Sequence, residues 1–184
     1  MLTGAYFETD FASFLAWRDW GFPDQSIRNA FPQTALLAAA GAFLLGVMGG
    51  HTANAGRVYF PSGTPDLNDV EGDRVDVAGS LVRELREETG LDAGDFAVQS
   101  GWTAVLSGPL IALFRVVRAT ESAAALRQRI LGNIAGEADP ELADIHIVRS
   151  PADYDSRMTG YVTAYLDDFR RRQAPDTGLS VGSR

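Results

Sequence analysis

The chain has 184 residues, of which 46% are hydrophobic and 22% charged, as is typical of one globular domain with its own core. Its net charge of −8 argues against a protein that binds nucleic acid through a broad basic surface. The absence of cysteine excludes disulfides, thiolate-bound zinc and thiol catalysis, and two histidines are too few for a His-rich metal site.

Targeting and membrane signals are not visible in the sequence. No basic segment is followed by an apolar core and a small-residue cleavage site. The most apolar run, residues 35–48, is shorter than the roughly 20 residues that a membrane-spanning helix needs. We therefore expect a soluble cytoplasmic protein with no membrane partner.

The first 30 residues precede the recognisable core of the domain. Residues 2–7 are expected to form a strand and residues 10–20 a helix, which a turn with glycine and proline ends. The dense aromatic residues of the helix favour a lid packed on the domain or an arm that joins a dimer. The alternative is that one of these aromatic residues stacks on a substrate ring, as such residues do on bases: Trp17, Trp20 or Phe22.

A buried hairpin is predicted next. Two apolar runs, 34–38 and 42–48, flank a turn of small residues, which is typical of paired buried strands. A glycine-rich loop at 49–56 then leads into a strand at 57–60. Three polar residues here are candidate contacts to a phosphate or substrate: His51, Asn54 and Arg57. Simpler interpretations are a hydrogen-bonding turn residue for the histidine and a surface ion pair for the arginine.

Residues 76–90 carry the signals of a helix. Asp76 is the expected N-cap, residues 77–88 the body, and Gly90 the residue that ends the helix. The apolar residues fall on one side, as the helical period requires. The preceding stretch, 61–75, contains several prolines and glycines and is expected to form a long irregular loop.

Three carboxylates of this helix share one face. Glu84, Glu87 and Glu88 are neighbours because residues three and four apart in a helix lie side by side. Like charges at that spacing cost roughly 0.2–0.5 kcal/mol per pair, so a compensating charge is expected. A divalent cation such as Mg²⁺ provides it, and Arg83 is a partner for one carboxylate. The alternative is a solvated acidic face with ordinary ion pairs.

The string at 83–91 resembles the second half of the Nudix box, whose full pattern is G-x5-E-x7-R-E-U-x-E-E-x-G-U, with U a bulky aliphatic residue. Every fixed position of that half is matched in this sequence. The first half departs from the pattern, because the spacing places Asp69 and Val75 where the glycine and the first glutamate are expected. An insertion explains the departure.

With that insertion, Gly63 takes the place of the box glycine. The first glutamate has no clean counterpart: Val75 lies at its spacing, Asp76 is adjacent and is a cap first, and Glu71 lies in the lengthened loop. The departure concerns the geometry of the loop rather than that of the helix.

The resemblance implies an α+β fold of the Nudix type, an α/β/α sandwich with a mixed β-sheet and the catalytic loop-helix. It also implies a hydrolase dependent on Mg²⁺ or Mn²⁺. The substrate class is a nucleoside diphosphate linked to another moiety, such as ADP-ribose, a nucleotide sugar or a dinucleotide, cleaved at the pyrophosphate bond. The implied metal ligands are a backbone carbonyl and carboxylates: Gly63, Glu84 and Glu88, with Glu87 either a further ligand or the partner of Arg83. The implied general base is a glutamate of the box or one outside it. Arg83 is implied to orient the ligands, and the resemblance is compatible with a homodimer.

A non-catalytic Nudix domain, which senses a nucleotide or scaffolds a partner, is the alternative. The altered first half of the box favours it, whereas the intact set of three carboxylates argues against it. An isopentenyl isomerase on the same fold needs a catalytic cysteine and is excluded.

After the helix, strands are predicted at 96–105, with a glycine interruption, and at 110–117. Thr120 is the expected cap of a helix at 121–134. An acidic segment then precedes a strand at 145–148. Nudix enzymes often take a further metal ligand or the general base from a loop outside the box, and the candidates here are Glu137 and Glu141.

The last predicted helix spans 158–169, with apolar residues on one face. The sequence thus predicts three parts, which are an N-terminal extension at 1–30, a Nudix hydrolase domain at 31–172 and a flexible tail at 173–184.

Overall fold

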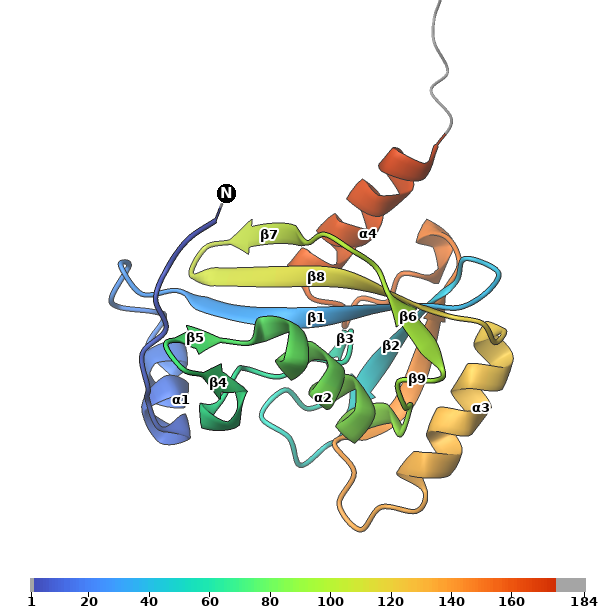
Figure 1. Cartoon of the computed structure of the whole chain (residues 1–184), viewed down its shortest axis with the longest axis horizontal. Helices are drawn as coiled ribbons and strands as arrows, with labels where there is room; N and C mark the ends of the chain where they lie inside the picture. Colours follow the sequence, from blue (N-terminus) through green and yellow to red (C-terminus); the bar gives the residue numbers. More distant parts are fainter. Residues whose placement is uncertain (1, 175–184) are drawn as a thin grey trace, which may run out of the picture.

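The computed structural model describes residues 2–174, and seven strands in this range form one mixed sheet (Figure 1). The strands are β1 Asn29–Leu37, β2 Phe43–Met48, β3 Val58–Tyr59, β6 Phe96–Val98, β7 Thr103–Ser107, β8 Leu110–Ala119 and β9 Leu142–Val148. β1 and β8 form a long parallel pair at the centre. β2 pairs with β1, β3 and β9, while β8 pairs with β6 and β7, all of them antiparallel.

Helices cover both faces of this sheet. The four α-helices of the described residues are α1 Phe11–Asp19, α2 Val77–Thr89, α3 Ala123–Ile134 and α4 Gly160–Gln173. Figure 1 shows α2 on one side of the central strands and α4 on the other, with α3 beside β9. The predicted α+β fold, an α/β/α sandwich with a mixed sheet, is therefore confirmed.

Two apolar layers hold the sandwich together. On the α2 side, Leu81 and Leu85 are buried against the sheet, and the Thr34 hydroxyl donates to the Leu81 carbonyl at 3.3 Å. On the α4 side the core is aromatic, with the ring of Tyr165 stacked on that of Phe114 at 4.1 Å between centroids. Burying each such side chain contributes roughly 1.5–3 kcal/mol, so these contacts fix the position of α2 on the sheet.

Several predicted elements are confirmed. The β1–β2 hairpin turns at Gly41, whose φ of 82° is a backbone conformation that favours glycine. α1 begins after Asp10, whose side chain accepts from the Ser13 amide at 2.8 Å. α3 places Leu126 and Ile130 in the core, as its apolar stripe predicts.

Other predictions are wrong in detail. Residues 2–10 form no strand, and the Tyr6 hydroxyl donates a 3.1 Å hydrogen bond to the Ala30 carbonyl of β1. α3 begins after Ser122 rather than Thr120, because the Ser122 hydroxyl accepts from the Ala125 amide at 3.2 Å.

The ends of the last helix and the predicted tail also differ from expectation. α4 begins at Gly160 and continues to Gln173, past the expected end at residue 169. Residues 175–184 of the predicted tail lie outside the described residues. Among residues 2–174, no helix is both long and apolar enough to cross a membrane.

Candidate functional site

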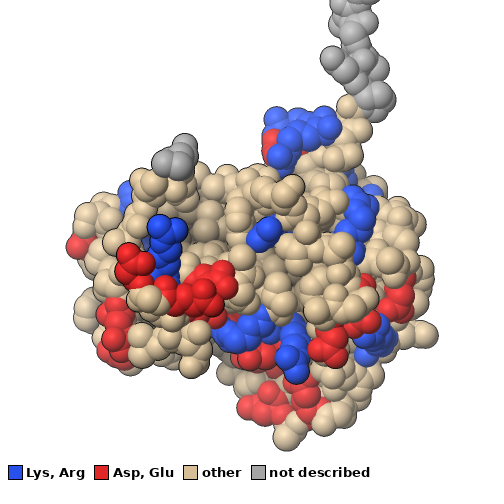
Figure 2. Space-filling model, in the orientation of Figure 1, with Lys and Arg blue, Asp and Glu red and all other residues tan. Residues whose placement is uncertain are grey.

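Helix α2 presents its acidic face at the edge of the sandwich. The Asp76 side chain accepts from the Ala78 amide at 3.1 Å and caps the helix, as predicted. Gly90 ends it with a φ of 69°, and its amide donates to the Arg86 carbonyl at 2.8 Å. Figure 2 shows acidic and basic side chains interleaved along the face of the molecule that carries α2.

Arg83 organises the carboxylates around it. Its Nε and Nη2 donate to the two oxygens of Asp69 at 3.2 and 2.9 Å, a forked pair. Its Nη1 lies 2.9 Å from Glu84 Oε1 and 3.0 Å from Glu87 Oε2. Burial acts to raise the pKa of Asp69, but hydrogen bonds from Arg83 and from a backbone amide outweigh it and hold that pKa below its ordinary value. The predicted role of Arg83 as a carboxylate partner is borne out by this geometry.

Asp69 is the site residue that the sequence interpretation missed. It follows Gly63 at the spacing that the box assigns to its first glutamate, so counting forward from the glycine would have found it. Asp69 is therefore the carboxylate at the position of the first glutamate of the box, and it contacts Arg83. The other candidates lie elsewhere: Glu71 is exposed on β4, Val75 lies in β5 and Asp76 is the helix cap.

The insertion lies after Asp69 and forms its own hairpin, which the predicted irregular loop did not include. β4 (Val70–Glu71) pairs with β5 (Arg74–Val75), and Gly72 between them has a φ of 66°. The Asp76 amide donates to the Asp69 carbonyl at 2.7 Å, which brings the two ends of the insertion together. The two ends of segment 70–75 thus lie next to each other. The insertion therefore leaves the loop before it and helix α2 after it in place.

Deleting residues 70–75 should leave the protein folded. The hydrogen bond between Asp69 and Asp76 already brings together the residues that the deletion would join, and the deleted residues are mostly exposed. We expect the melting temperature to change by no more than about 4 °C, which at this size corresponds to roughly 1 kcal/mol. Loss of the cooperative thermal transition, followed by circular dichroism, would contradict this account of the insertion.

Replacing Asp69 by Asn should destabilise the protein, because the buried arm of Arg83 then loses a charged acceptor. We expect a loss of about 1–3 kcal/mol in the free energy of unfolding at pH 7, measured by urea titration. Since the pKa of Asp69 is lowered in the folded state, this stabilisation is present above the ordinary pKa and is lost as pH falls through the folded value. The matched control is Asp73→Asn in the exposed turn of the hairpin, which should change stability little.

Glu84 and Glu88 are carboxylates in a confined space. Glu88 is only 6% exposed, its Oε1 accepts from the Ser62 amide at 2.9 Å, and its Oε2 is buried without a hydrogen-bond partner among the described residues. Glu84 lies so close to Gly63 that a Cβ at that position would overlap its carboxylate. The predicted proximity of Gly63 to the helix carboxylates is therefore observed.

Burial changes the acidity of both groups. Burial raises the pKa of Glu84 to about 7, with Arg83 opposing the change and the charge of Glu87 adding to it. Burial also raises the pKa of Glu88 well above its ordinary value, against the hydrogen bond from Ser62. Both shifts have the same main cause, which is that burial disfavours the charged form of each carboxylate.

These residues fit a divalent metal ion by their chemistry, although their side chains do not converge on one point. Glu84 and Glu87 turn to Arg83, and Glu88 turns to the Ser62 amide. Within residues 2–174, no three His, Cys, Asp or Glu side chains are grouped as a ready metal site. The unpartnered oxygen of Glu88 and the bare backbone at Gly63 nevertheless supply the oxygen donors that Mg²⁺ and Mn²⁺ prefer.

The two candidates from the acidic segment differ in position. The charge of Glu141 adds to the raised pKa values of both Glu84 and Glu88. Glu137 instead accepts a 2.6 Å hydrogen bond from Asn133 near the end of α3. Of the two, Glu141 is the one whose charge acts on the carboxylates of α2.

The three candidate substrate contacts lie in different surroundings. His51 lies in a turn, and its Nε2 is 3.3 Å from Oδ1 of Asp139. Asn54 donates to the Tyr59 hydroxyl at 3.2 Å, and Asn54 and Arg57 line one side of a hollow. The structure thus brings together two of the three candidates.

The aromatic residues of the N-terminal extension pack on one another. The rings of Trp17 and Phe22 meet edge to face at 4.7 Å between centroids, and Trp20 is 76% exposed. Packing within the extension therefore accounts for the positions of Trp17 and Phe22 without a substrate ring.

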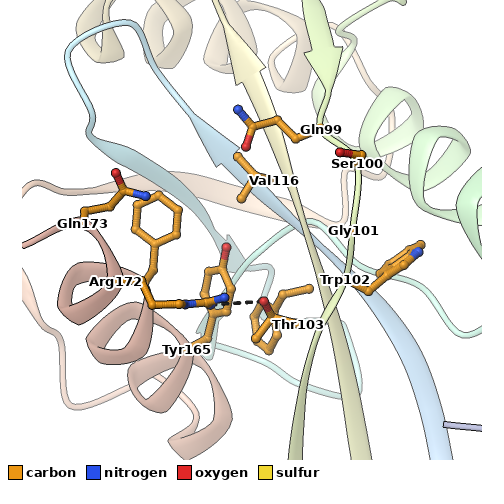
Figure 3. Close-up of a pocket in the computed structure, with 11 residues that line it drawn as sticks. Gln99, Ser100, Gly101, Trp102, Thr103, Val116, Tyr165, Arg172 and Gln173 are labelled. Carbon is orange, nitrogen blue, oxygen red and sulfur yellow. Dashed lines mark hydrogen bonds between the residues drawn. The ribbon is translucent and has the colours of Figure 1, made fainter. Parts of the chain in front are cut away.

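A second hollow, of about 250 Å³, lies between α4 and the β6–β7 segment (Figure 3). Arg172 donates to the Thr103 hydroxyl at 3.1 Å across it, and Trp102 lies at its side under the guanidinium of Arg115. The Tyr165 hydroxyl on its wall is buried without a described hydrogen-bond partner. No sequence pattern marked this hollow, because its residues come from separate parts of the chain, namely residues 99–103, strand β8 and helix α4.

Comparison with known proteins was made by sequence and by structure. No protein-family model matches the sequence, and no curated protein matches it. Among solved structures, a bifunctional NMN adenylyltransferase/ADP-ribose pyrophosphatase from Francisella tularensis aligns over 89% of this chain with a TM-score of 0.56 and 14% identity. The alignment covers 46% of that longer protein.

Two further solved structures align over most of their own length. A Nudix hydrolase from M. smegmatis matches with a TM-score of 0.50 and 16% identity, covering 86% of this chain and 90% of that one. The MutT protein from Methanosarcina mazei matches with a TM-score of 0.50 and 15% identity, covering 81% and 97%. The chain therefore has the Nudix fold, as its box residues predicted.

Proposed function

We propose that this protein is a metal-dependent Nudix hydrolase that cleaves the pyrophosphate bond of a nucleoside diphosphate linked to another moiety. The observation that carries the proposal is the pair of buried carboxylates, Glu84 and Glu88, held against the backbone at 62–63 with raised pKa values. Burying both carboxylates as anions costs free energy, because Arg83 contacts Glu84 and leaves the buried Oε2 of Glu88 without a partner, and a divalent ion offsets that cost.

The proposed ligands of Mg²⁺ or Mn²⁺ are one backbone carbonyl and three carboxylates: Gly63, Glu84, Glu87 and Glu88. The bound metal would neutralise the diphosphate and lower the pKa of coordinated water. Arg83 orients Glu84, and Asp69 in turn holds Arg83 in place through its forked pair. These contacts keep Glu84 beside the backbone at Gly63.

A carboxylate outside the box is the proposed general base. Glu141 is favoured over Glu137 because its charge is felt by both Glu84 and Glu88. In this role Glu141 would accept the proton of the attacking water, and the box carboxylates would hold the metal.

We propose ADP-ribose, nucleotide sugars and dinucleotides as the substrates to try first. ADP-ribose leads this set because the similar protein from Francisella tularensis is described as an ADP-ribose pyrophosphatase. We further propose that the protein acts in the cytoplasm on small molecules, as a monomer or homodimer, with neither nucleic acid nor a membrane as partner. In this proposal residues 31–172 form the hydrolase domain and residues 1–30 an extension to it.

The alternative is a Nudix domain without catalysis that binds a nucleotide as a sensor or scaffold. The observation in its favour is that Glu84 and Glu87 are turned to Arg83 rather than to a shared point. Calorimetric titration separates the two functions. Tight nucleotide binding without metal, together with no turnover on a broad panel, would favour the sensor.

The direct test is an assay with Mg²⁺ or Mn²⁺ for release of a nucleoside monophosphate from ADP-ribose, nucleotide sugars and dinucleotides. We expect turnover by the wild type on at least one substrate, loss of turnover in EDTA and loss in Glu88→Gln. Equal rates in the wild type and Glu88→Gln would remove the assignment of the site.

A further inference from the structure

Two arginines from distant parts of the chain line one hollow. Arg18 comes from α1 in the N-terminal extension, and Arg57 directly precedes β3. Together with Ala53, Asn54 and Ala55 they line an open surface hollow of about 420 Å³. We call this the arginine hollow, and no carboxylate is among the described residues that line it.

The charge of the arginine hollow is unusual for this chain, whose net charge is −8. Arg18 uses its Nε to contact Asp19 at 3.0 Å, and its terminal nitrogens have no carboxylate partner within residues 2–174. Arg57 forms no ion pair with any described residue. Several guanidinium donors are therefore available to a ligand in a hollow that repels cations.

A short chain of contacts joins the arginine hollow to the carboxylates of α2. Asn54, on the wall of the hollow, donates to the Tyr59 hydroxyl at 3.2 Å. Burial raises the pKa of the Tyr59 phenol, the hydrogen bond from Asn54 opposes this, and the charges of Glu88 and Glu141 add to the rise. Three residues after Tyr59, the Ser62 amide donates to Glu88 Oε1 at 2.9 Å, so residues 59–62 connect the wall of the hollow to the candidate metal site.

We propose that the arginine hollow binds a phosphate group carried by the second half of the substrate. This inference rests on the proposed function and narrows it, since the substrate class becomes a nucleoside diphosphate derivative whose other moiety bears a phosphomonoester. Two guanidinium groups with an amide match the oxygens of a phosphate. The remaining lining, Ala53 and Ala55, gives space but no aromatic face on which a base would stack.

The inference assigns a role to the N-terminal extension. Arg18 reaches the arginine hollow only because α1 folds back against the domain near the 49–56 loop. Selectivity for the second half of the substrate would then depend on a segment outside the box, whereas the diphosphate is handled by α2.

The first experiment is a calorimetric titration of the full chain with inorganic pyrophosphate in EDTA at low ionic strength. Loss of one charged hydrogen-bonding group costs about 1.5–3 kcal/mol, so Arg18→Gln and Arg57→Gln should each weaken binding roughly 10- to 100-fold. The matched control is Arg171→Gln, which removes the same charge from an exposed site on α4 and should change affinity less than about twofold. Equal affinities in all four proteins, or no binding to the wild type, would overturn the proposal.

The second experiment identifies the source of the phosphate. Two nucleoside diphosphate sugars that differ only in a phosphate on the sugar are titrated in EDTA. The wild type should bind the phosphorylated compound at least about tenfold more tightly, and the ratio should fall towards one in Arg18→Gln and Arg57→Gln. A ratio near one in the wild type, or no measurable binding of the phosphorylated compound, would overturn the assignment to the substrate.

Both experiments measure binding without metal and therefore without turnover. A protein that binds as described but hydrolyses nothing would contradict the proposed function and leave the arginine hollow supported. If the wild type and Arg57→Gln hydrolyse the substrate at equal rates and bind pyrophosphate with equal affinity, the result would support the proposed function and contradict the arginine hollow.

Discussion

Replacing Glu88 by Gln should abolish turnover and make the metal-free protein more stable. The rate should fall by on the order of 100- to 1,000-fold, because the substitution removes a buried anionic ligand from the proposed metal site. In EDTA at pH 8 the variant should melt roughly 2–8 °C higher than the wild type, which corresponds to about 1–2 kcal/mol for a chain of this size. Activity assays and differential scanning calorimetry measure the two effects.

The direction of the pH dependence follows from the raised pKa values. The folded pKa of Glu88 lies well above its ordinary value of 4.5, and that of Glu84 is raised to about 7. The stability contributed by their protonated forms is fully present below the ordinary value and is lost as pH rises through the folded value. In EDTA the wild type should therefore lose stability as the pH is raised from about 5 to 8, and the variant should lose less.

Added Mg²⁺ or Mn²⁺ should raise the melting temperature of the wild type at pH 8 and leave that of Glu88→Gln nearly unchanged. Glu71→Gln, which removes the same charge from the exposed β4 strand, should behave like the wild type in every measurement. A metal response of equal size in Glu88→Gln would contradict the proposed ligand set.

Replacing Gly63 by Ala should remove activity while the fold survives. A Cβ at this position would overlap the Glu84 carboxylate, which is the far end of a flexible side chain and can move away. The cost to stability should be below about 1 kcal/mol, whereas displacing a proposed ligand from its position should lower the rate by on the order of 100-fold. Steady-state kinetics and urea denaturation separate the two effects.

Gly94→Ala is the matched control, because a Cβ there meets no neighbouring atom and its backbone is not in the left-handed region. It should leave both activity and stability unchanged. If Gly63→Ala retained full activity, the close approach of backbone and carboxylate would have no catalytic role.

The helix of the box was predictable from sequence because its signals are local. The cap at Asp76, the stop at Gly90 and the clustered glutamates all follow from spacing along one helix. The position of Asp69 depends instead on a closure between residues on either side of an insertion, which counting back from Arg83 hides. The inserted residues change the sequence spacing between Asp69 and Arg83, but the Asp69 carboxylate still lies beside Arg83.

Elements without strong tertiary contacts were the hardest to predict. Residues 2–7 have apolar residues suited to a strand, yet no strand edge of the described sheet takes them up. Thr120 and Ser122 are both good caps by residue type, and the later start of α3 is seen only in the hydrogen bond that the Ser122 hydroxyl accepts from the Ala125 amide. The arginine hollow was equally out of reach, since Arg18 and Arg57 come together through the tertiary fold.

The hairpin at 70–75 also offers a practical way to manipulate the protein. Its tip at Gly72 points away from other atoms, so foreign residues grafted there would meet no neighbour. A fluorescent label or a peptide epitope spliced into this tip would be tethered next to Arg83 without crossing the box helix. Such a graft would allow ligand-induced changes around α2 to be followed in real time.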